Sequence, residues 1–381
     1  MTGAAPTILL SAGEPSGDLH GAAVARALRR RWPNVRLFGL GGPKMAEAGV
    51  ELLADMNELA VMGFAEVVGR IPFFLGLLRR IRGELRERGA DLVVPIDYPG
   101  FNLRLARAAR ELGTPVLYYI APQVWAWHRS RIHQLARTAD HLAVILPFEE
   151  PLFREAGARV TFVGHPLLDA VPEIRSREAF CAELGLDPRR PILALFPGSR
   201  AQEVERHLTV FTEAALWAME GHPGVQPVIA AAESLDAAAY AGAPFPVVRR
   251  SAELLAHARA ALVKSGTTTL QAALAGVPIV IAYRTHPVTF WLAKRLVRVD
   301  HIGLANLVAG RRVAPEFLQD EAEPAALAAA LLPLLSDGPE RRAMVEAFGQ
   351  VRASLTVPDG SGASTADRVV ALAAELLDRR G

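Results

Sequence analysis

Short apolar runs alternate with segments of helical periodicity along the chain. The run Thr7–Ser11 (TILLS) leads into a glycine-containing loop, and Asp18–Arg31 then repeats apolar residues three and four positions apart. A continuous apolar run is typical of a strand that is buried on both faces, and the second spacing is typical of an amphipathic helix. The pattern therefore predicts the strand–loop–helix unit of a parallel α/β sheet.

This alternation occurs twice, with a break between the two halves. Gly164–Ser176 contains two prolines and no clear period, so we interpret it as an interdomain linker between domains of residues 1–168 and 169–363. Before it, strands are predicted at Val35–Leu40, Asp91–Ile96, Val116–Ile120, His141–Leu146 and Val160–Val163, with a helix at Leu103–Leu112. After it, strands are predicted at Ile192–Phe196, Pro227–Ala231, Ala260–Val263 and Pro278–Ala282. Helices are predicted at Thr267–Ala275, Val288–Val297, Pro324–Leu335, Pro339–Leu355 and Ser364–Arg379. Two doubly wound, Rossmann-like domains follow, each binding its ligands at the carboxyl ends of its strands.

Composition supports this division and excludes some functions. A single hydrophobic core rarely exceeds about 250–300 residues, and this chain has 381. With 42 basic and 40 acidic residues, the bulk charge does not favour nucleic acid as a partner. The single cysteine, Cys181, can form neither an internal disulfide nor a cysteine zinc cluster. The sequence predicts no secretory signal and no transmembrane helix.

In the first half, three segments follow predicted strands and carry candidate chemistry. The loop Gly13–Asp18 brings backbone N–H groups to a helix start and suits an anion, although a simple turn capped by Asp18 or Ser16 explains it equally. Asp97 ends a predicted strand and is placed as a general base, or else as a helix cap. Trp125 and Trp127 suit sugar stacking, but core packing is the more common role of tryptophan.

In the second half, two strand-to-helix turns suit phosphate. Gly198, Ser199 and Arg200 open one helix, where the guanidinium suits a phosphate. Lys264–Gln271 (KSGTTTLQ) is a similar turn rich in hydroxyl groups, and it lacks the order of a P-loop. Ordinary turns are the alternative for both.

The segment Leu59–Arg88 combines bulky apolar residues with arginines. Such a surface binds anionic lipids, although a buried helix with solvated arginines fits the pattern as well. Its apolar candidates are Val61, Met62, Phe64, Val67, Val68, Ile71, Phe73 and Phe74.

Several of these segments, in this order, resemble one family. They are SAGEPSGDLHGA, ELAVMGFAEVVGR, IDYPGFN, PQVWAW, FVGHPL, LFPGSRAQEVE, SGTTTL and ANLVAG. Between about Ile8 and Leu335 the chain resembles the lipid-A-disaccharide synthases, which are glycosyltransferases of GT-B architecture with two domains facing a cleft. The resemblance implies an inverting transfer from UDP-2,3-diacylglucosamine to 2,3-diacylglucosamine 1-phosphate, with neither a metal nor another cofactor.

The resemblance also implies roles for individual residues. Asp97 matches the base that deprotonates the acceptor 6-hydroxyl, and Glu14 and Asp18 match acidic positions of the first loop. The implied donor residues are Gly198, Ser199, Arg200, Ser265, Gly266, Thr267, Thr268, Gln271 and Asn306. The implied acceptor and membrane-facing residues are the apolar candidates above, together with Trp125 and Trp127. The C-terminal residues 364–381 are expected to return to the first domain.

The remaining expectations concern location and rival functions. The resemblance implies a cytoplasmic protein, peripheral on the inner face of the cytoplasmic membrane, and a homodimer stays open. Gly100 stands where many relatives carry a second Asp, and Gln271 stands where many carry Glu. Other GT-B enzymes, such as a lipid-linked glycosyltransferase or a UDP-sugar epimerase, and a non-catalytic lipid-binding protein are the alternatives. The loop after the first strand lacks GxGxxG, which disfavours a dinucleotide oxidoreductase.

Overall fold

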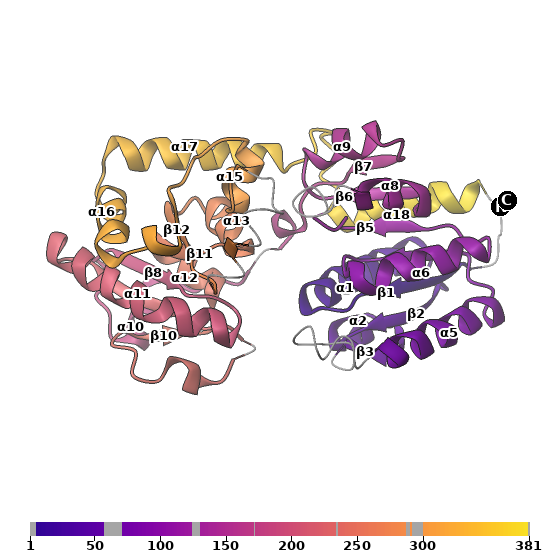
Figure 1. Ribbon diagram of the computed structural model, residues 1–381, viewed down its shortest axis with the longest axis horizontal. Coiled ribbons are helices and arrows are strands. Elements are labelled where there is room, and N and C mark those ends of the chain that lie inside the picture. The colour runs from indigo at the N-terminus through magenta and orange to yellow at the C-terminus, as the bar shows by residue number, and fades with distance from the viewer. Residues whose placement is uncertain are drawn as a thin grey trace. The chain divides into compact units, whose positions relative to one another are not determined.

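The computed structural model describes residues 5–56, 71–123, 130–170, 172–233, 235–286, 290–291 and 300–379. The chain forms two compact units (Figure 1). The first unit comprises Met1–Asp169 and Val357–Gly381, and the second comprises Ala170–Thr356. The division falls within the predicted linker, Gly164–Ser176.

The first unit is built on parallel strands. One sheet has the order β3-β2-β1-β4, a second has the order β5-β6-β7, and isolated parallel bridges join β4 to β5. The strands are β1 (Thr7–Ser11), β2 (Arg36–Gly41), β3 (Glu51–Asp55), β4 (Leu92–Pro95), β5 (Leu117–Tyr119), β6 (His141–Val144) and β7 (Val160–Phe162). The helices are α1 (Pro15–Arg31), α2 (Pro43–Glu47), α5 (Ile71–Glu87), α6 (Pro99–Glu111), α8 (Ser130–Thr138), α9 (Glu149–Glu155) and α18 (Thr365–Asp378), with a 3₁₀ turn at Pro166–Leu168.

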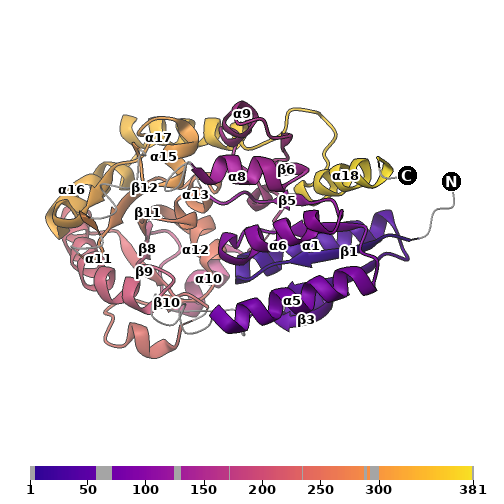
Figure 2. The ribbon, with the colours of Figure 1, turned by 45° about the vertical axis from the view of Figure 1, so that its right-hand side comes forward.

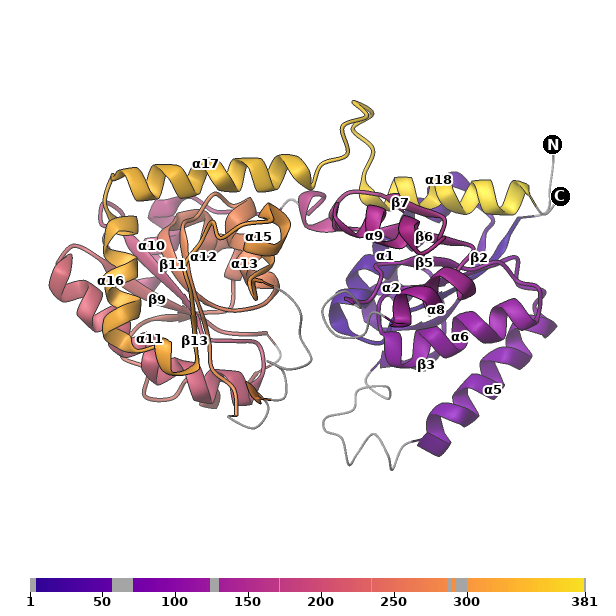
Figure 3. The same cartoon turned by 45° about the horizontal axis from the view of Figure 1, so that its top comes forward.

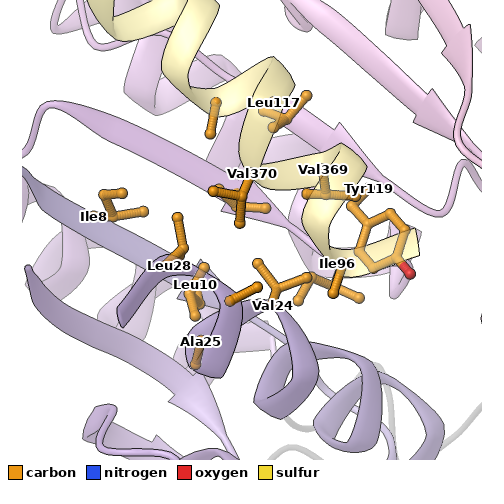
Figure 4. Packing of buried hydrophobic residues seen from close by; sticks show 14 of the residues in the cluster. Ile8, Leu10, Val24, Ala25, Leu28, Ile96, Leu117, Tyr119, Val369 and Val370 are labelled. Carbon is orange, nitrogen blue, oxygen red and sulfur yellow. The ribbon is translucent and has the colours of Figure 1, made fainter. Parts of the chain in front are cut away.

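Helices cover both faces of this sheet, because its strands bury side chains on both sides. Ile8 and Leu10 of β1 point into a cluster with α1, α2 and α18, which Figure 4 shows from close by. Leu9, between them, points into a second cluster with α5, α6, α8 and α9. Figure 2 shows α5 beside α6 on that second side. The continuous apolar run of β1 therefore serves two cores at once.

The second unit contains one parallel sheet in the order β10-β9-β8-β11-β12-β13. Its strands are β8 (Ile192–Phe196), β9 (Gln226–Ala230), β10 (Val247–Val248), β11 (Ala258–Lys264), β12 (Ile279–Tyr283) and β13 (Glu316–Leu318). Its helices are α10 (Arg177–Leu184), α11 (Ala201–Gly221), α12 (Ser251–His257), α13 (Thr267–Leu274), α15 (Leu304–Ala309), α16 (Pro324–Leu335) and α17 (Pro339–Ser354), with 3₁₀ turns at Ala237–Tyr240 and Gln319–Glu321. Figure 3 shows α17 running beside α13 and α15.

The strand order of each unit places its ligand site. In chain order within the unit, the second sheet is 3-2-1-4-5-6, the order of a dinucleotide-binding Rossmann sheet, and the first sheet begins in the same way. The order reverses between β1 and β4 in one unit and between β8 and β11 in the other. Ligands bind such sheets at the carboxyl ends of the strands that flank this reversal.

Two further findings bear on the predictions. The helix predicted at Val288–Val297 lies largely outside the described residues. Among the helices that the structure does describe, none is long and apolar enough to cross a bilayer.

Candidate functional site

Asp97 occupies a strained turn directly after β4. Asp97 and Tyr98 have φ angles of 47° and 48°, so two consecutive residues with side chains adopt the left-handed conformation. Each such residue costs about 1–3 kcal/mol and persists only when its surroundings hold it. Here the Asp97 N–H donates to the Tyr119 carbonyl at 3.0 Å, and the Tyr118 hydroxyl donates to the Asp97 carbonyl at 2.8 Å. The turn places Asp97 at the carboxyl end of the sheet.

Asn102 is the second support of this turn, and we did not predict it from the sequence. Its buried amide donates to the Asp97 carbonyl at 2.8 Å and to the Ile96 and Ser11 carbonyls at 3.2 and 3.1 Å. Its side-chain oxygen accepts a hydrogen bond of 2.6 Å from the Ser11 hydroxyl. Asn102 therefore ties the end of β1 to the end of β4, at the point where the strand order reverses.

The carboxyl group of Asp97 is unusually basic. Burial, followed by the negative charge of Glu14, raises the pKa of Asp97 to about 6, against a backbone N–H at Tyr98 that lowers it. The loop of Glu14 lies close to this turn, because a side chain on Gly13 would meet the Tyr98 ring at 2.4 Å. A carboxyl group that titrates near neutral pH is suited to act as a general base.

Asp18 is hydrogen-bonded inside the first unit. Its carboxylate is fully buried and accepts hydrogen bonds from the N–H groups of Gly42, Met45 and Lys44 at 2.8, 3.0 and 3.1 Å. These N–H groups belong to the first turn of α2 and the residue before it, so Asp18 caps that helix from outside. These hydrogen bonds give Asp18 a structural role, and the catalytic role that the resemblance implies stays a prediction.

A second group of titratable side chains lies near the ends of β5 and β7. Burial lowers the pKa of His20 and of His165 to about 4 each, so both rings are neutral at pH 7. Burial, followed by the negative charge of Asp169, raises the pKa of Tyr119. The His20 and Tyr119 rings meet edge to face at 6.5 Å.

In the second unit, the loop after β8 carries three predicted donor residues. Gly198 has a φ of 142°, and a side chain there would meet the Cβ of Glu203 at 2.5 Å, so glycine is required. The Ser199 N–H donates to Glu203 Oε2 at 3.0 Å, and the exposed Arg200 is the N-cap of α11. Glu203, in the first turn of α11, was not predicted as part of the site.

The loop after β11 lies across the same reversal of strand order. The Ser265 hydroxyl donates to the Ile302 carbonyl at 2.8 Å, and Gly266 has a φ of 152° as the N-cap of α13. Thr267 and Thr268 lie in the first turn of α13, and Gln271 lies one turn further, half-buried. This arrangement leaves the helix start open toward the carboxyl side of the sheet, which is where phosphates bind.

A buried histidine joins this region to β12. His207 accepts a 2.8 Å hydrogen bond from the Arg284 N–H at Nε2, and its Nδ1 donates to the Glu203 carbonyl at 2.7 Å. Both bonds fit only the neutral ring, and burial lowers the pKa of His207 accordingly. The start of α11 is therefore fixed against the end of a neighbouring strand.

Asn306 is held by hydrogen bonds within the second unit. It is fully buried, and its amide donates to the Ala314 carbonyl and to Glu316 Oε1, both at 2.8 Å. Its oxygen accepts from the N–H groups of Val313 and Ala314. These contacts fix the loop around Asn306, and its contact with the nucleotide stays a prediction.

The predicted acceptor region is described only in part. Val61, Met62, Phe64, Val67, Val68, Trp125 and Trp127 lie outside the described residues, as does the side chain of Ile71. Phe73 is exposed on α5, with Leu75 beside it. Phe74 is partly buried and packs against Phe101 of the core, with ring centroids 6.2 Å apart, and its membrane-facing role stays a prediction.

A surface hollow in the second unit lies away from this chemistry. It has a volume of about 660 Å³ and lies at the amino ends of β8 and β11, where Pro191 and Ala258 line it. Ligands of such sheets bind at the opposite end of the strands. Within the described ranges, no three or more His, Cys, Asp or Glu side chains gather as metal ligands.

Comparison with known proteins identifies the family. A model of the family described as lipid-A-disaccharide synthetase matches residues 8–357. The lipid-A-disaccharide synthase of Trichlorobacter lovleyi is 43% identical over 371 residues, which cover 96% of this chain and 95% of that protein. The enzyme of the same name from Syntrophus aciditrophicus is 43% identical over 373 residues, covering 96% and 97%. The chain belongs to the lipid-A-disaccharide synthase family. It is therefore a glycosyltransferase of lipid A biosynthesis.

Solved structures give the fold independently. The calicheamicin glycosyltransferase CalG4 is 19% identical, covers 99% of this chain and 100% of its own, and has a TM-score of 0.62. A Listeria monocytogenes protein whose structure is described as that of a UDP-N-acetylglucosamine 2-epimerase is 14% identical. The match covers 99% of this chain and 98% of that chain, with a TM-score of 0.67. The predicted GT-B class is confirmed. Because transferases and epimerases share this fold, the synthase family is decided by the sequence relatives and not by the architecture.

Proposed function

We propose that this protein transfers diacylglucosamine from UDP-2,3-diacylglucosamine to the 6-hydroxyl of 2,3-diacylglucosamine 1-phosphate. The products are a β-1,6-linked disaccharide 1-phosphate and UDP. The observation that carries the proposal is Asp97, a half-buried carboxyl group with a pKa of about 6 on a rigidly held turn at a ligand-binding edge. An inverting transfer needs such a base on the attacking hydroxyl.

The leaving group is stabilised by the second unit. The starts of α11 and α13 offer backbone N–H groups, and Arg200 adds a guanidinium that is well exposed to an incoming ligand. Fixed donors of this kind stabilise the charge that grows on a departing diphosphate. Ser265, Gly266 and Thr267 line the same edge, so we assign them to the donor diphosphate.

The acyl chains of both substrates require contact with a membrane. We assign this contact to α5, which buries Leu77, Ile81 and Leu85 and exposes Phe73 and Leu75. Arg79 and Arg80 are exposed on the same helix. Exposed apolar side chains beside cationic ones bind anionic lipid surfaces from one side.

The test is acceptor-dependent UDP release by purified protein in detergent, with both lipid substrates and no added metal. Asp97→Asn should bind UDP like the native protein and lose about 10²–10⁴-fold in turnover, because it cannot take the proton. A new disaccharide together with this loss supports the proposal. Native-like turnover in Asp97→Asn would move the base to Glu14 or His20, and UDP binding without turnover would indicate another acceptor.

The pH profile of the same reaction is a second test. The base must be ionised, so kcat/KM should fall below about pH 6, following the raised pKa of Asp97. Glu14→Gln removes the negative charge that adds to this shift, so it should move the acid limb of the profile to lower pH. A limb that stays in place would show that Glu14 does not act on the base.

A further inference from the structure

The carboxylate of Glu203 occupies a position suited to an external anion. The Ser199 N–H donates to its Oε2 at 3.0 Å, and the Lys264 ammonium donates to its Oε1 at 2.9 Å. Arg200 Nη1 lies 3.8 Å from Oε1. A main-chain N–H group, an ammonium and a guanidinium therefore converge on one negatively charged group.

This ion pair is largely withdrawn from water. The side chains of Lys264 and Glu203 are 16% and 15% exposed, and the Lys264 ammonium lies 5.5 Å from the centroid of the Tyr283 ring. Gly198 allows the arrangement, because any side chain there would collide with the Cβ of Glu203. Burial acts to raise the pKa of Glu203, but Lys264 and the Ser199 N–H lower it below its ordinary value. The carboxylate is therefore ionised at neutral pH.

The position coincides with the phosphate-binding place of the fold. Lys264 is the last residue of β11, and Ser199 follows β8, so the pair spans the reversal of strand order in the second unit. Helix starts, lysine and arginine are the groups that proteins use to bind phosphate at this point of a sheet. In the structure, the carboxylate of Glu203 from the same unit holds these groups.

We propose that Lys264 is a ligand of the donor's diphosphate and that Glu203 is an intramolecular competitor for the same place. The inference rests on the proposed function, which places the donor in this unit. When the diphosphate binds, Lys264 and the Ser199 N–H turn from the carboxylate to a phosphate oxygen. Glu203 then swings away, since two like charges repel at this distance. No covalent bond changes in this step.

The competitor limits how tightly the nucleotide is held. After transfer, the returning carboxylate neutralises Lys264 as the UDP leaves, so the cationic site does not retain the product. The affinity for UDP therefore depends on how much more strongly these donors bind the diphosphate than the Glu203 carboxylate. The two partners of this ion pair must therefore have opposite effects on UDP binding when they are substituted.

The test measures the Kd of UDP by isothermal titration calorimetry with the full-length protein, without acceptor or metal. Lys264→Met should weaken UDP binding about tenfold or more, because a charged hydrogen bond to the diphosphate is lost. Glu203→Gln should tighten UDP binding roughly threefold or more, because the competing charge is gone. Lys264→Arg should restore much of the affinity that Lys264→Met loses.

Matched controls on the same helix separate this effect from net charge. Glu205→Gln changes the net charge by the same amount as Glu203→Gln, and Arg206→Met by the same amount as Lys264→Met. Both controls lie at exposed positions of α11 and should leave the Kd of UDP unchanged. If Glu203→Gln does not fold, Glu203→Asp withdraws the carboxylate by one methylene group and should tighten binding in the same direction. Unfolding temperatures measured without UDP check that each variant is folded.

The opposite signs decide the outcome. A salt bridge that only held α11 in place would make both substitutions weaken UDP binding, and this result, or an unchanged Kd in Lys264→Met, would overturn the inference. In either case, UDP binding by the native protein would leave the proposed function standing. A native protein that does not bind UDP at all would overturn both.

Discussion

Asp97 combines two unfavourable features in one residue. Its backbone is left-handed, and its carboxyl group is desolvated and lies close to the charge of Glu14. Both features cost folding free energy, and both suit the proposed base, which must be aimed and must accept a proton near neutral pH. The surrounding hydrogen bonds from Tyr118 and Asn102 oppose the strain.

The desolvation cost predicts that Asp97→Asn is stabilised at high pH. The pKa of Asp97 rises from 3.8 to about 6, so the folded state binds this proton more tightly than the unfolded state. The contribution of this bound proton to the stability of the folded state is complete below pH 3.8 and is lost as the pH rises through about 6. A shift of about two units corresponds to roughly 3 kcal/mol. In urea unfolding, the free energy of unfolding of Asp97→Asn relative to the native protein should therefore be higher at pH 8 than at pH 4.5. An equal difference at both pH values would contradict the assigned pKa.

Asn102 is predicted to act through the position of Asp97. Asn102→Ala leaves the Ser11, Ile96 and Asp97 carbonyls without this donor, which should cost about 1–3 kcal/mol of stability. Because the base then lies less well against the acceptor, kcat should fall while KM changes little. UDP affinity is the internal control, since the donor residues lie in the other unit. A proportional loss of UDP binding would point to general unfolding instead.

His20 and His165 predict sensitivity to acid. The pKa values of His20 and His165 are lowered to about 4, so the unfolded state binds these protons first. The contribution of each neutral ring is complete above pH 6.5 and is lost as the pH falls toward 4. His165→Gln should therefore flatten the fall in unfolding temperature between pH 7 and pH 4.5. A curve parallel to that of the native protein would show that His165 is not held neutral.

At the scale of elements, the central strands were predictable, whereas three of the edge strands were not. Strands such as β1, β8 and β12 consist almost wholly of apolar residues, because both of their faces are buried. The strands that the sequence did not reveal are β3, β10 and β13, each at an edge of its sheet in the structure. β10 has only two residues, and β13 begins with Glu316, whose carboxylate accepts hydrogen bonds from Ile302 and Gly303. Edge strands of this kind lack the continuous apolar run.

The candidate site was predictable where chemistry follows a strand directly. Asp97, the turn at Gly198–Arg200 and the turn at Ser265–Thr267 each continue a buried strand, so their place at the carboxyl edge follows from the parallel fold. Asn102, Glu203 and Glu316 were not predictable, because their roles depend on partners that lie elsewhere in the chain or on how one turn folds back. The internal hydrogen bonds of Asp18 and Asn306 were not predictable for the same reason: residue type alone does not show that a polar group is satisfied internally.

The exposed face of α5 predicts how the protein meets lipid. Replacing Phe73 and Leu75 by Ser should lower the partitioning onto anionic vesicles about tenfold or more. The variant lacks two large apolar side chains that the native protein would transfer from water into the bilayer. Leu216→Ser with Trp217→Ser removes equally exposed apolar side chains from α11 and is the matched control. Phe74→Ser should instead lower stability, since its ring packs against Phe101. Equal partitioning of the first variant and the control would remove α5 as the membrane contact.

At the scale of the whole molecule, the chain ends in the unit where it began. After α17 in the second unit, the chain enters the first unit, where α18 packs against α1. Val369 and Val370 lie in one cluster with Ile8 and Leu10 (Figure 4). Thr365 donates its N–H to Asp169 Oδ2 at 2.8 Å, which fixes the start of α18 beside the last residue of the N-terminal part. The first unit is therefore complete only when the last residues are present.

This connectivity predicts that a substitution near the C-terminus destabilises the first unit and spares the second. Leu376 is buried in the same cluster as Ile8, so Leu376→Ala should cost about 2–5 kcal/mol there. Scanning calorimetry should then show two transitions, of which only one moves to lower temperature. Saturating UDP should raise the other transition, because a ligand stabilises only the unit that binds it. Asp378→Ala, at an exposed position of the same helix, should leave both transitions in place. If UDP raised the transition that Leu376→Ala lowers, the nucleotide would bind the first unit, and the assignment of the donor to the second unit would be wrong.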